Sequence, residues 1–383
     1  MDVTKRKSDA DSLRYRRIVA KFGTNLLTAG TDRLDLEVMS ALVGQVARLH
    51  QAGAEVILVT SGAIAAGRHQ IDCPPDRRDG LSRQVLAAVG QSHLMQCYDE
   101  LFSWHGITIA QALLSRRDLS DRVGYLNARN TLLALLELRA VPIVNENDVV
   151  AVEEIEGARI GDNDNLSALV ANLVDADLLV MLTDTGGLYT ADPRLDRQAR
   201  LIARVDRIDE EIERLAGGAS PDSRGTGGMA TKIEAAKLAV AGGATVVIVG
   251  GGERDVLPRL ARGEELGTLF PSQVDRMESR KRWMLSRLAV RGRITVDAGA
   301  ARALQQQNKS LLPAGVKAVD GAFERGEAVD ICTVEGKRIA CGIVNYSRDE
   351  VEAIRGLRSD RIAETLGHDY GSEVVHRSNL VLL

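Results

Sequence analysis

The chain has 383 residues, of which 45% are hydrophobic and 27% charged, so it can bury the core of one large α/β domain and of a smaller second domain. Its formal net charge of −4 and its pI of about 6.0 give it no general attraction to nucleic acid or to an anionic membrane. No apolar run approaches the ~20 residues that span a bilayer. The cysteines show no Cys-x-x-Cys spacing, so neither a zinc ribbon nor a disulfide framework is indicated.

The first residues are polar and of mixed charge. Met1 to Arg17 lacks the apolar core that a secretion signal needs. We therefore expect residues 1–14 to form a disordered extension and the protein to be cytoplasmic.

Short runs rich in β-branched residues alternate with amphipathic stretches as far as about Gly251. The expected strands are Ile18 to Phe22, Glu55 to Thr60, Thr108 to Leu113, Val141 to Asn145, Leu178 to Thr183 and Thr245 to Gly250. The expected helices are Leu36 to His50, Ser82 to Phe102, Gly124 to Leu138, Asn165 to Leu173 and Ala230 to Ala241. This alternation predicts an α/β domain over residues 15–270, a three-layer αβα sandwich with a mainly parallel central sheet. Open parallel sheets bind ligands outside the carboxyl ends of their strands.

The alternation of apolar runs and amphipathic stretches stops after Phe270-Pro271, and a basic linker is expected over residues 271–290. Short strands and tight turns predict a small β-rich domain over residues 291–383, with Val329 to Val334 and Arg338 to Val344 as a β-hairpin. From Arg291 to Leu383 the chain has 13 Lys plus Arg and 13 Asp plus Glu. This balance argues against phosphate-driven binding of RNA.

The segment from Val144 to Asp148, followed by Gly161 to Asn165, is rich in acids and amides. Amides such as Asn145 and Asn163 can donate to a carboxylate, while aspartates can hold an ammonium group. That combination predicts a pocket for an amino acid. The alternative is a solvated acidic loop whose Asn and Asp residues only cap helices and turns.

A glycine-rich loop, Gly225 to Lys232, precedes the expected helix Ala230 to Ala241. Free amides at the start of a helix favour a phosphate. The loop also fits Gly-x-Gly-x-x-Ala, but residues 216–224 before it do not form the strand that a dinucleotide fold requires. No Gly-x-x-x-x-Gly-Lys-Ser/Thr occurs, which excludes a P-loop kinase. A surface turn with Lys232 in solvent is the alternative.

Three further strand ends carry candidate binding groups. Lys21 with Gly23 can lie against phosphate oxygens, and Ser61 opens a helix of small residues whose first amides suit an anion. Thr183 and Asp184 begin a polar loop where a nucleotide base and ribose can dock. The plain alternatives are a solvated lysine, a helix-capping serine and an ordinary loop.

The six histidines show neither metal-ligand spacing nor an evident partner, so no metal site built from protein ligands is expected.

Taken together and in this order, the motifs resemble the amino-acid kinase family, and within it the glutamate 5-kinases. The matching segments cover nearly the whole chain: Lys21 to Thr24, Val59 to Ile64, Asn145 to Asp148, Gly161 to Asn165, Leu182 to Asp184, Gly187 to Pro193 and Gly225 to Lys232. The tail, with Ile294 to Asp297 and Ser310 to Pro313, resembles a PUA domain. Phe22 and Asn25 depart from the usual leucine and serine.

The resemblance implies an amino-acid kinase fold and ATP-dependent phosphorylation of the L-glutamate γ-carboxylate to L-glutamyl 5-phosphate. This reaction opens proline biosynthesis, and the resemblance also implies feedback by proline, a homo-oligomer, and ATP with Mg²⁺ as cofactors. The implied catalytic residues are Lys21, Lys232, Asp164 and Asp162, with Asp164 orienting the two lysines. The implied glutamate-binding residues are Ser61, Asp148 and Asn163. The implied ATP-binding residues are Lys21, Thr183, Asp184, Thr226, Gly227, Gly228, Met229, Ala230, Thr231 and Lys232.

Three alternatives stay open from the residues. A kinase for aspartate or N-acetylglutamate is the nearest, although Asp148 suits a free ammonium group that an acetylated amine lacks. The PUA-like tail leaves room for an RNA-binding or RNA-modification protein. A NAD-dependent oxidoreductase is the third.

Overall fold

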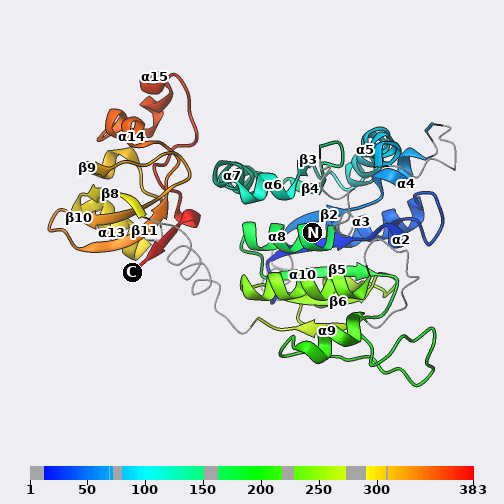
Figure 1. Cartoon of the computed structure of the whole chain (residues 1–383). Helices are drawn as coiled ribbons and strands as arrows, with labels where there is room; N and C mark the ends of the chain where they lie inside the picture. Colours follow the sequence, from blue (N-terminus) through cyan, green and yellow to red (C-terminus); the bar gives the residue numbers. More distant parts are fainter. Residues whose placement is uncertain are drawn as a thin grey trace, which may run out of the picture. The chain divides into compact units, whose positions relative to one another are not determined.

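A computed structural model of the chain describes residues 13–68, 70–71, 80–150, 163–217, 228–272, 290–307 and 309–383. The chain divides into two compact units, which can be followed by colour in Figure 1. The first unit comprises Met1–Ser120 and Ala128–Val274, and the second comprises Asp121–Asn127 and Asp275–Leu383. The expected extension and linker lie almost wholly outside the described residues.

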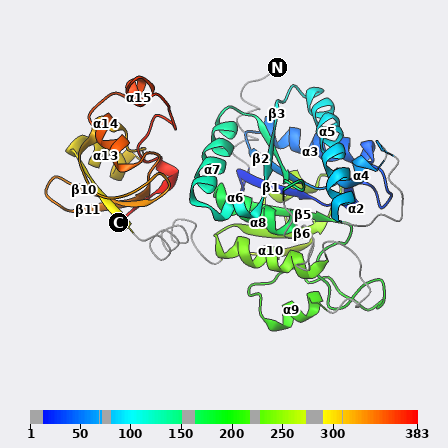
Figure 2. The same ribbon diagram turned by 45° about the horizontal axis from the view of Figure 1, so that its top comes forward.

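A seven-stranded sheet runs through the middle of the first unit (Figure 2). Its strands are β1 (Arg17–Phe22), β2 (Glu55–Thr60), β3 (Ile109–Leu114), β4 (Val141–Glu146), β5 (Leu178–Thr183), β6 (Thr245–Gly250) and β7 (Thr268–Phe270). The order across the sheet is β3-β4-β2-β1-β5-β6-β7, and every neighbouring pair is parallel except β6 with β7. The six predicted strands are therefore confirmed to within one residue at each end. The short antiparallel strand β7 was not predicted.

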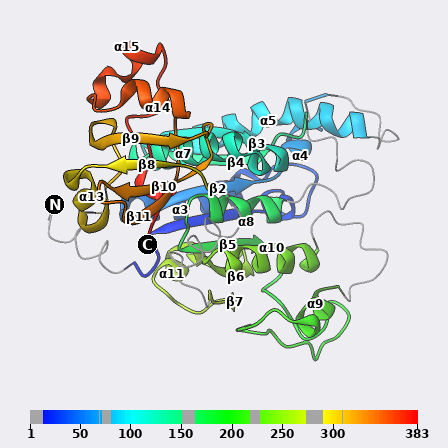
Figure 3. The same ribbon diagram turned by 60° about the vertical axis from the view of Figure 1, so that its left-hand side comes forward.

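Helices cover both faces of this sheet. The helices of the first unit are α2 (Thr24–Leu27), α3 (Leu36–Gln51), α4 (Ala63–Gly67), α5 (Gly80–Ser103), α6 (Arg116–Ser120), α7 (Arg122–Glu137, from Ala128 onward), α8 (Asn163–Leu173), α9 (Glu210–Gly217), α10 (Met229–Ala241) and α11 (Val256–Ala261). Helices α8 and α10 lie side by side, as Figures 1 and 3 show, and α8 contacts β1, β2, β4 and β5. Helix α3 contacts β2, α5 and α11. The three-layer α/β architecture is thus confirmed.

Side-chain alternation along β1 assigns its residues to the two faces. Ile18, Ala20 and Phe22 belong to the buried core that also contains Leu42 of α3 and Leu94 of α5. Successive residues of a strand point to opposite faces, so Val19 and Lys21 face the layer of α8 and α10. One buried lysine therefore sits at the carboxyl end of an otherwise apolar strand, on the face that carries α8.

Two local features fix α3, the first long helix. Asp35 caps its start by accepting from the backbone N–H groups of Glu37 and Val38, each at 3.0 Å. Gly53, with φ of +93°, turns the chain back toward β2 after the helix ends. None of the helices in the described ranges is long and apolar enough to cross a membrane.

The second unit is a small domain built on a five-stranded sheet of order β12-β11-β10-β8-β9. Its strands are β8 (Val290–Val296), β9 (Val316–Gly321), β10 (Ala328–Thr333), β11 (Arg338–Ile343) and β12 (Leu380–Leu382). Its helices are α13 (Ala298–Gln307), α14 (Arg348–Ile354) and α15 (Ile362–Leu366), with 3₁₀ turns at Pro313–Gly315, Ser359–Arg361 and Arg377–Asn379. Strands β10 and β11 pair antiparallel around Glu335-Gly336, which confirms the predicted hairpin.

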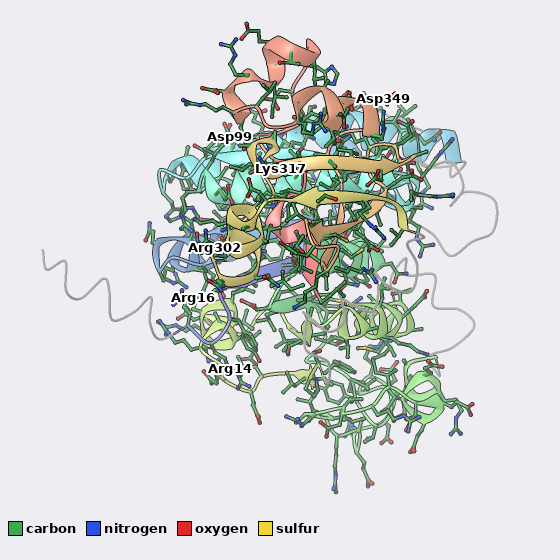
Figure 4. The ribbon with its side chains drawn as sticks, turned by 90° about the vertical axis from the view of Figure 1, so that its left-hand side faces the viewer. Arg14, Arg16, Asp99, Arg302, Lys317 and Asp349 are labelled. Atoms are coloured by element: carbon green, nitrogen blue, oxygen red, sulfur yellow. The ribbon has the colours of Figure 1, made fainter. Side chains whose placement is uncertain are left out.

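Exposed side chains of both signs cover this second unit. Arg302 on α13, Lys317 on β9 and Asp349 on α14 are all exposed, and Figure 4 labels them. At the start of α14, Ser347 and Glu350 form a reciprocal capping box. Exposed charges of both signs are therefore present on this unit.

Candidate active site

The centre of the candidate site is an aspartate held between two lysines. Lys21 Nζ lies 2.5 Å from Asp164 Oδ1, and Lys232 Nζ lies 3.1 Å from Asp164 Oδ2. Lys21 is the penultimate residue of β1, Asp164 lies in the first turn of α8, and Lys232 lies in the first turn of α10. All three side chains are buried, and that of Asp164 is 0% exposed. The contact between α8 and α10 brings these distant parts of the sequence together.

Electrostatics keeps Asp164 ionised. Burial raises the pKa of this carboxyl, but the charges of Lys21 and Lys232 and their hydrogen bonds outweigh burial and lower the pKa to about 2. One carboxylate charge therefore faces two ammonium charges. The remaining positive charge, in a place where water is scarce, suits a phosphate ligand.

The start of α10 adds backbone N–H donors that no capping side chain satisfies among the described residues. Gly228 occupies the cap position in an extended conformation and supplies no side chain to the first amides of the helix. Thr231 Oγ1 lies 3.0 Å from Asp164 Oδ2 and 2.7 Å from Gly228 O, and its single proton can be donated to either acceptor. The helix start, including Met229 and Ala230, thus opens beside the two lysines, as a phosphate-binding loop requires.

Asn163, next to Asp164 on α8, links the ends of two strands. Its Nδ2 donates to Thr60 O at 2.9 Å, to Ser61 Oγ at 2.9 Å and to Asn145 Oδ1 at 3.1 Å. Ser61 follows β2, and Asn145 lies near the end of β4. The structure therefore gathers both asparagines and the serine into one hydrogen-bonded cluster at the carboxyl ends of the strands.

Thr183 and Asp184 form a second polar corner, at the end of β5. Thr183 Oγ1 donates to Asp184 Oδ1 at 2.9 Å, and Asn25 Nδ2 donates to Asp184 Oδ2 at 3.3 Å. Burial raises the pKa of Asp184, but these two hydrogen bonds outweigh it, so the pKa lies below its ordinary value. Asn25, which departs from the usual serine, thus orients an ionised carboxylate in the predicted nucleotide loop.

Not every predicted site residue is described. Asp148 lies half-buried in the turn after β4 and takes part in at least one interaction. Asp162, Thr226 and Gly227 lie outside the described residues. The other predicted residues cluster at the carboxyl ends of β1, β2 and β5 and at the starts of α8 and α10.

Two polar residues of α5 contact this site and were not predicted. Gln91 Oε1 accepts from Asn145 Nδ2 at 2.8 Å, and the buried hydroxyl of Tyr98 lies 2.7 Å from Thr60 Oγ1. Both lie in a helix that the sequence identified only by its apolar periodicity. A polar residue on the buried side of such a helix is the one signal that points to them.

Comparison with known proteins places this geometry in a family. A model of the amino acid kinase family matches residues 16–250, and a model of the PUA domain matches residues 292–366. The glutamate 5-kinase of Dehalococcoides mccartyi (strain CBDB1) is 53% identical over 369 residues, which are 96% of this chain and 99% of that protein. The glutamate 5-kinase of Herpetosiphon aurantiacus is 52% identical over 96% of this chain and 98% of its own length. A UMP kinase structure from Bacillus anthracis aligns with a TM-score of 0.48 at 13% identity, over 68% of this chain and 97% of that one.

The fold is that of an amino-acid kinase domain, followed by a PUA domain. The chain belongs to the glutamate 5-kinase family and is therefore an enzyme of the kinase class.

Proposed function

We propose that this protein transfers the γ-phosphoryl group of ATP to the γ-carboxylate of L-glutamate and forms L-glutamyl 5-phosphate. The observation that carries the proposal is the buried cluster of Lys21, Asp164 and Lys232, next to the polar cluster around Asn163. The relatives' activity, that of glutamate 5-kinases, supports glutamate as the substrate.

The chemistry needs no general base. A γ-carboxylate has a reference pKa of about 4.3, so it is already ionised at neutral pH and can attack phosphorus directly. A carboxylate oxygen forms the new bond to the γ-phosphorus while the bond from that phosphorus to the bridging oxygen of ADP breaks. Catalysis is then positioning and charge stabilisation, which Lys21, Lys232 and the first amides of α10 provide.

ATP is assigned to the side of the site formed by β5 and α10. Thr183, Asp184 and the segment from Thr226 to Lys232 would hold the nucleotide, and Lys21 would reach its phosphates. Magnesium prefers carboxylate and phosphate oxygens, and the ionised Asp184 near the lysines fits a magnesium ion that enters with the nucleotide. When bound, the metal ion would neutralise negative charge on the phosphates of the nucleotide.

Glutamate is assigned to the side formed by β2 and β4. Ser61 and Asn163 would bind the amino acid, and Asp148 would hold its ammonium group. Asp162 is the fourth proposed catalytic residue. In this proposal the catalytic domain covers residues 15–270, a linker covers 271–290, and the PUA domain with its tail covers 291–383.

The same proposal gives the protein its place in metabolism. Glutamyl phosphate is an activated acid, and its formation would be the first step of proline biosynthesis in the cytoplasm. Proline would act as a feedback inhibitor, and the enzyme would work as a homo-oligomer.

The test is to trap the acyl phosphate with hydroxylamine. Purified full-length protein with ATP, magnesium and L-glutamate should give the hydroxamate, and omission of ATP should abolish it. If L-aspartate or N-acetyl-L-glutamate gave hydroxamate while L-glutamate gave none, the substrate assignment would be wrong. A titration with L-proline in the same assay tests feedback, since selective inhibition at saturating ATP identifies both the pathway and the pocket.

A further inference from the structure

The two asparagines of the proposed substrate site, Asn145 and Asn163, have a fixed orientation. Asn145 Oδ1 accepts from the backbone N–H of Glu146 at 2.9 Å, so the other end of this amide, Nδ2, must point away from the strand. Asn163 Nδ2 donates to the backbone carbonyl of Thr60, so the other end of that amide is Oδ1. A backbone N–H can only donate and a carbonyl can only accept, which decides the polarity of both side chains.

Gln91 takes its orientation from Asn145. Because Asn145 Nδ2 must find an acceptor, Gln91 presents Oε1 to it at 2.8 Å. Gln91 Nε2 therefore points the other way, with two N–H donors. A short chain of hydrogen bonds thus runs from the backbone N–H of Glu146 through Asn145 to Gln91, here called the relay. In it, the orientation of each group sets the orientation of the next.

The relay ends in two buried atoms without a hydrogen-bond partner among the described residues. These are Gln91 Nε2, a donor, and Asn163 Oδ1, an acceptor. Leaving a buried polar group unpaired costs on the order of 1–3 kcal/mol, so such atoms call for a ligand. Donors suit a carboxylate and an acceptor suits an ammonium group, and an α-amino acid carries both.

Strand order decides which carboxylate meets Gln91. Lys21 lies on β1, and Asn145 lies on β4, with β2 between them. Neighbouring strands are about 4.8 Å apart, so Gln91 and Asn145 lie on the far side of Ser61 from the lysines that would hold the phosphates. The reacting γ-carboxylate must be on the lysine side, which leaves the α-carboxylate for the amide side.

We propose that Gln91 is a specificity-determining residue of the amino-acid site: its Nε2 donates to the α-carboxylate of the substrate, while Asn163 Oδ1 accepts from the ammonium group. This assignment rests on the proposed function, because the substrate end that meets Gln91 is defined by transfer to the γ-carboxylate. It adds a helix α5 residue to a site otherwise formed by strand ends and by α8 and α10.

Gln91→Glu tests the proposal because it replaces the N–H donors of Gln91 Nε2 by an acceptor oxygen and leaves the shape of the side chain nearly unchanged. The new carboxylate still accepts from Asn145 Nδ2, but it faces the substrate with a second acceptor. L-Glutamate should then be rejected, whereas L-isoglutamine, whose α-carboxamide can donate, should be accepted. We expect the ratio of kcat/KM for isoglutamine to that for glutamate to rise about 100-fold or more, since sites with unpaired polar groups discriminate strongly. An equal fall with both substrates, or no change, would overturn the assignment.

Two further variants separate recognition from folding. Gln91→Met keeps the length of the side chain and removes every N–H, so the KM for glutamate should rise at least about 10-fold with a smaller change in kcat. Gln96→Glu adds the same charge on the exposed side of α5, where Gln96 donates to Glu100 at 3.0 Å, and should leave the substrate ratio unchanged. A fall in kcat at constant KM in Gln91→Met would contradict a binding role.

Ligand-induced shifts in Tm measure the same preference without turnover. Wild-type protein should be stabilised more by glutamate than by isoglutamine, and Gln91→Glu should reverse that order. If the wild-type protein formed no hydroxamate from glutamate but the order of Tm shifts still reversed, the proposed function would fail and the role of Gln91 would stand. If glutamate were phosphorylated and no reversal followed, the role of Gln91 alone would fail.

Discussion

Lys21 Nζ and Asp164 Oδ1 lie 2.5 Å apart, and this contact joins the end of β1 to the start of α8. Asp164 also holds Lys232 at 3.1 Å through its second carboxylate oxygen. One carboxylate thus fixes the positions of two ammonium groups but neutralises only one of their two positive charges. The excess positive charge remains for the phosphates, and the geometry is set before any ligand binds, which is what electrostatic catalysis requires.

Lys232→Ala should lower kcat far more than it disturbs folding. The variant removes one of two charges that face the transferred phosphoryl group, so a fall of about 10²-fold or more is expected in the hydroxamate assay. Asp164 keeps Lys21 as its partner, so the Tm of the variant should change only slightly. An unchanged kcat would refute the assigned role of Lys232.

Helix α10 itself offers a matched control. Lys237 is exposed and pairs with Glu213 at 2.6 Å on the surface. Lys237→Ala removes the same charge from the same helix, and kcat should stay within about twofold because exposed ion pairs contribute little.

Gly90→Ala should disrupt the packing of α4 on α5. A Cβ on Gly90 would overlap the carbonyl oxygen of Ala63, and one on Gly67 would overlap that of Leu86, so the two helix backbones are in direct contact. Because backbone cannot move aside as a flexible side chain can, we expect a loss of about 3 kcal/mol or more in urea unfolding. Helix α4 begins two residues after Ser61, so the KM for glutamate should also rise.

Gly217→Ala is the control for this prediction. Gly217 ends α9, and no described atom lies within 4 Å of a Cβ added there. The free energy of unfolding should change by less than about 1 kcal/mol, in the stabilising direction if at all. Equal losses for the two variants would show that the contact between α4 and α5 is not the cause.

The sequence predicted most of the fold because its signals are local. Buried parallel strands such as β5 and β6 are short apolar runs, and helices such as α3 carry apolar residues at helical spacing, so both could be located within a few residues. Strand β7 has only three residues and pairs antiparallel at the edge of the sheet. It is defined by its partner β6 and not by a pattern of its own, which is why it was missed.

The candidate site was predictable where motifs follow strands and not where a helix reaches in from outside. Lys21, Ser61 and Thr183 end or follow apolar runs, so their place at one edge of the sheet follows from parallel topology. Gln91 and Tyr98 reach the site only because α5 packs over it. Their partners, Asn145 and Thr60, are remote in sequence, and hydrogen bonds between remote residues leave no local pattern.

Tyr98→Phe should weaken glutamate binding, although Tyr98 itself would make no contact with the glutamate. The Tyr98 hydroxyl lies 2.7 Å from Thr60 Oγ1, and the carbonyl of Thr60 holds Asn163. Loss of one buried hydrogen bond should cost about 1 kcal/mol of stability in urea unfolding. The KM for glutamate should rise a few-fold while the KM for ATP stays constant, since Asn163 faces the amino acid. Equal changes in the KM for glutamate and the KM for ATP would contradict an effect that passes from Tyr98 through Thr60 to Asn163.

Asp164→Asn should destabilise the protein in a pH-dependent way. The pKa of Asp164 is about 2 in the folded protein against an ordinary value of 3.8, so ionised Asp164 stabilises the fold fully above about pH 5 and progressively less as the pH falls toward 2. The variant leaves two buried ammonium groups without a carboxylate, for which we expect a loss of about 3–5 kcal/mol near pH 7. In urea unfolding at a series of pH values, the difference in free energy of unfolding between wild type and variant should be constant from about pH 8 to 5 and then shrink toward pH 2.

Asp206→Asn is the control: it breaks an exposed ion pair with Arg204 and should cost less than about 1 kcal/mol. A difference for Asp164→Asn that grows as the pH falls would contradict the lowered pKa of this carboxyl.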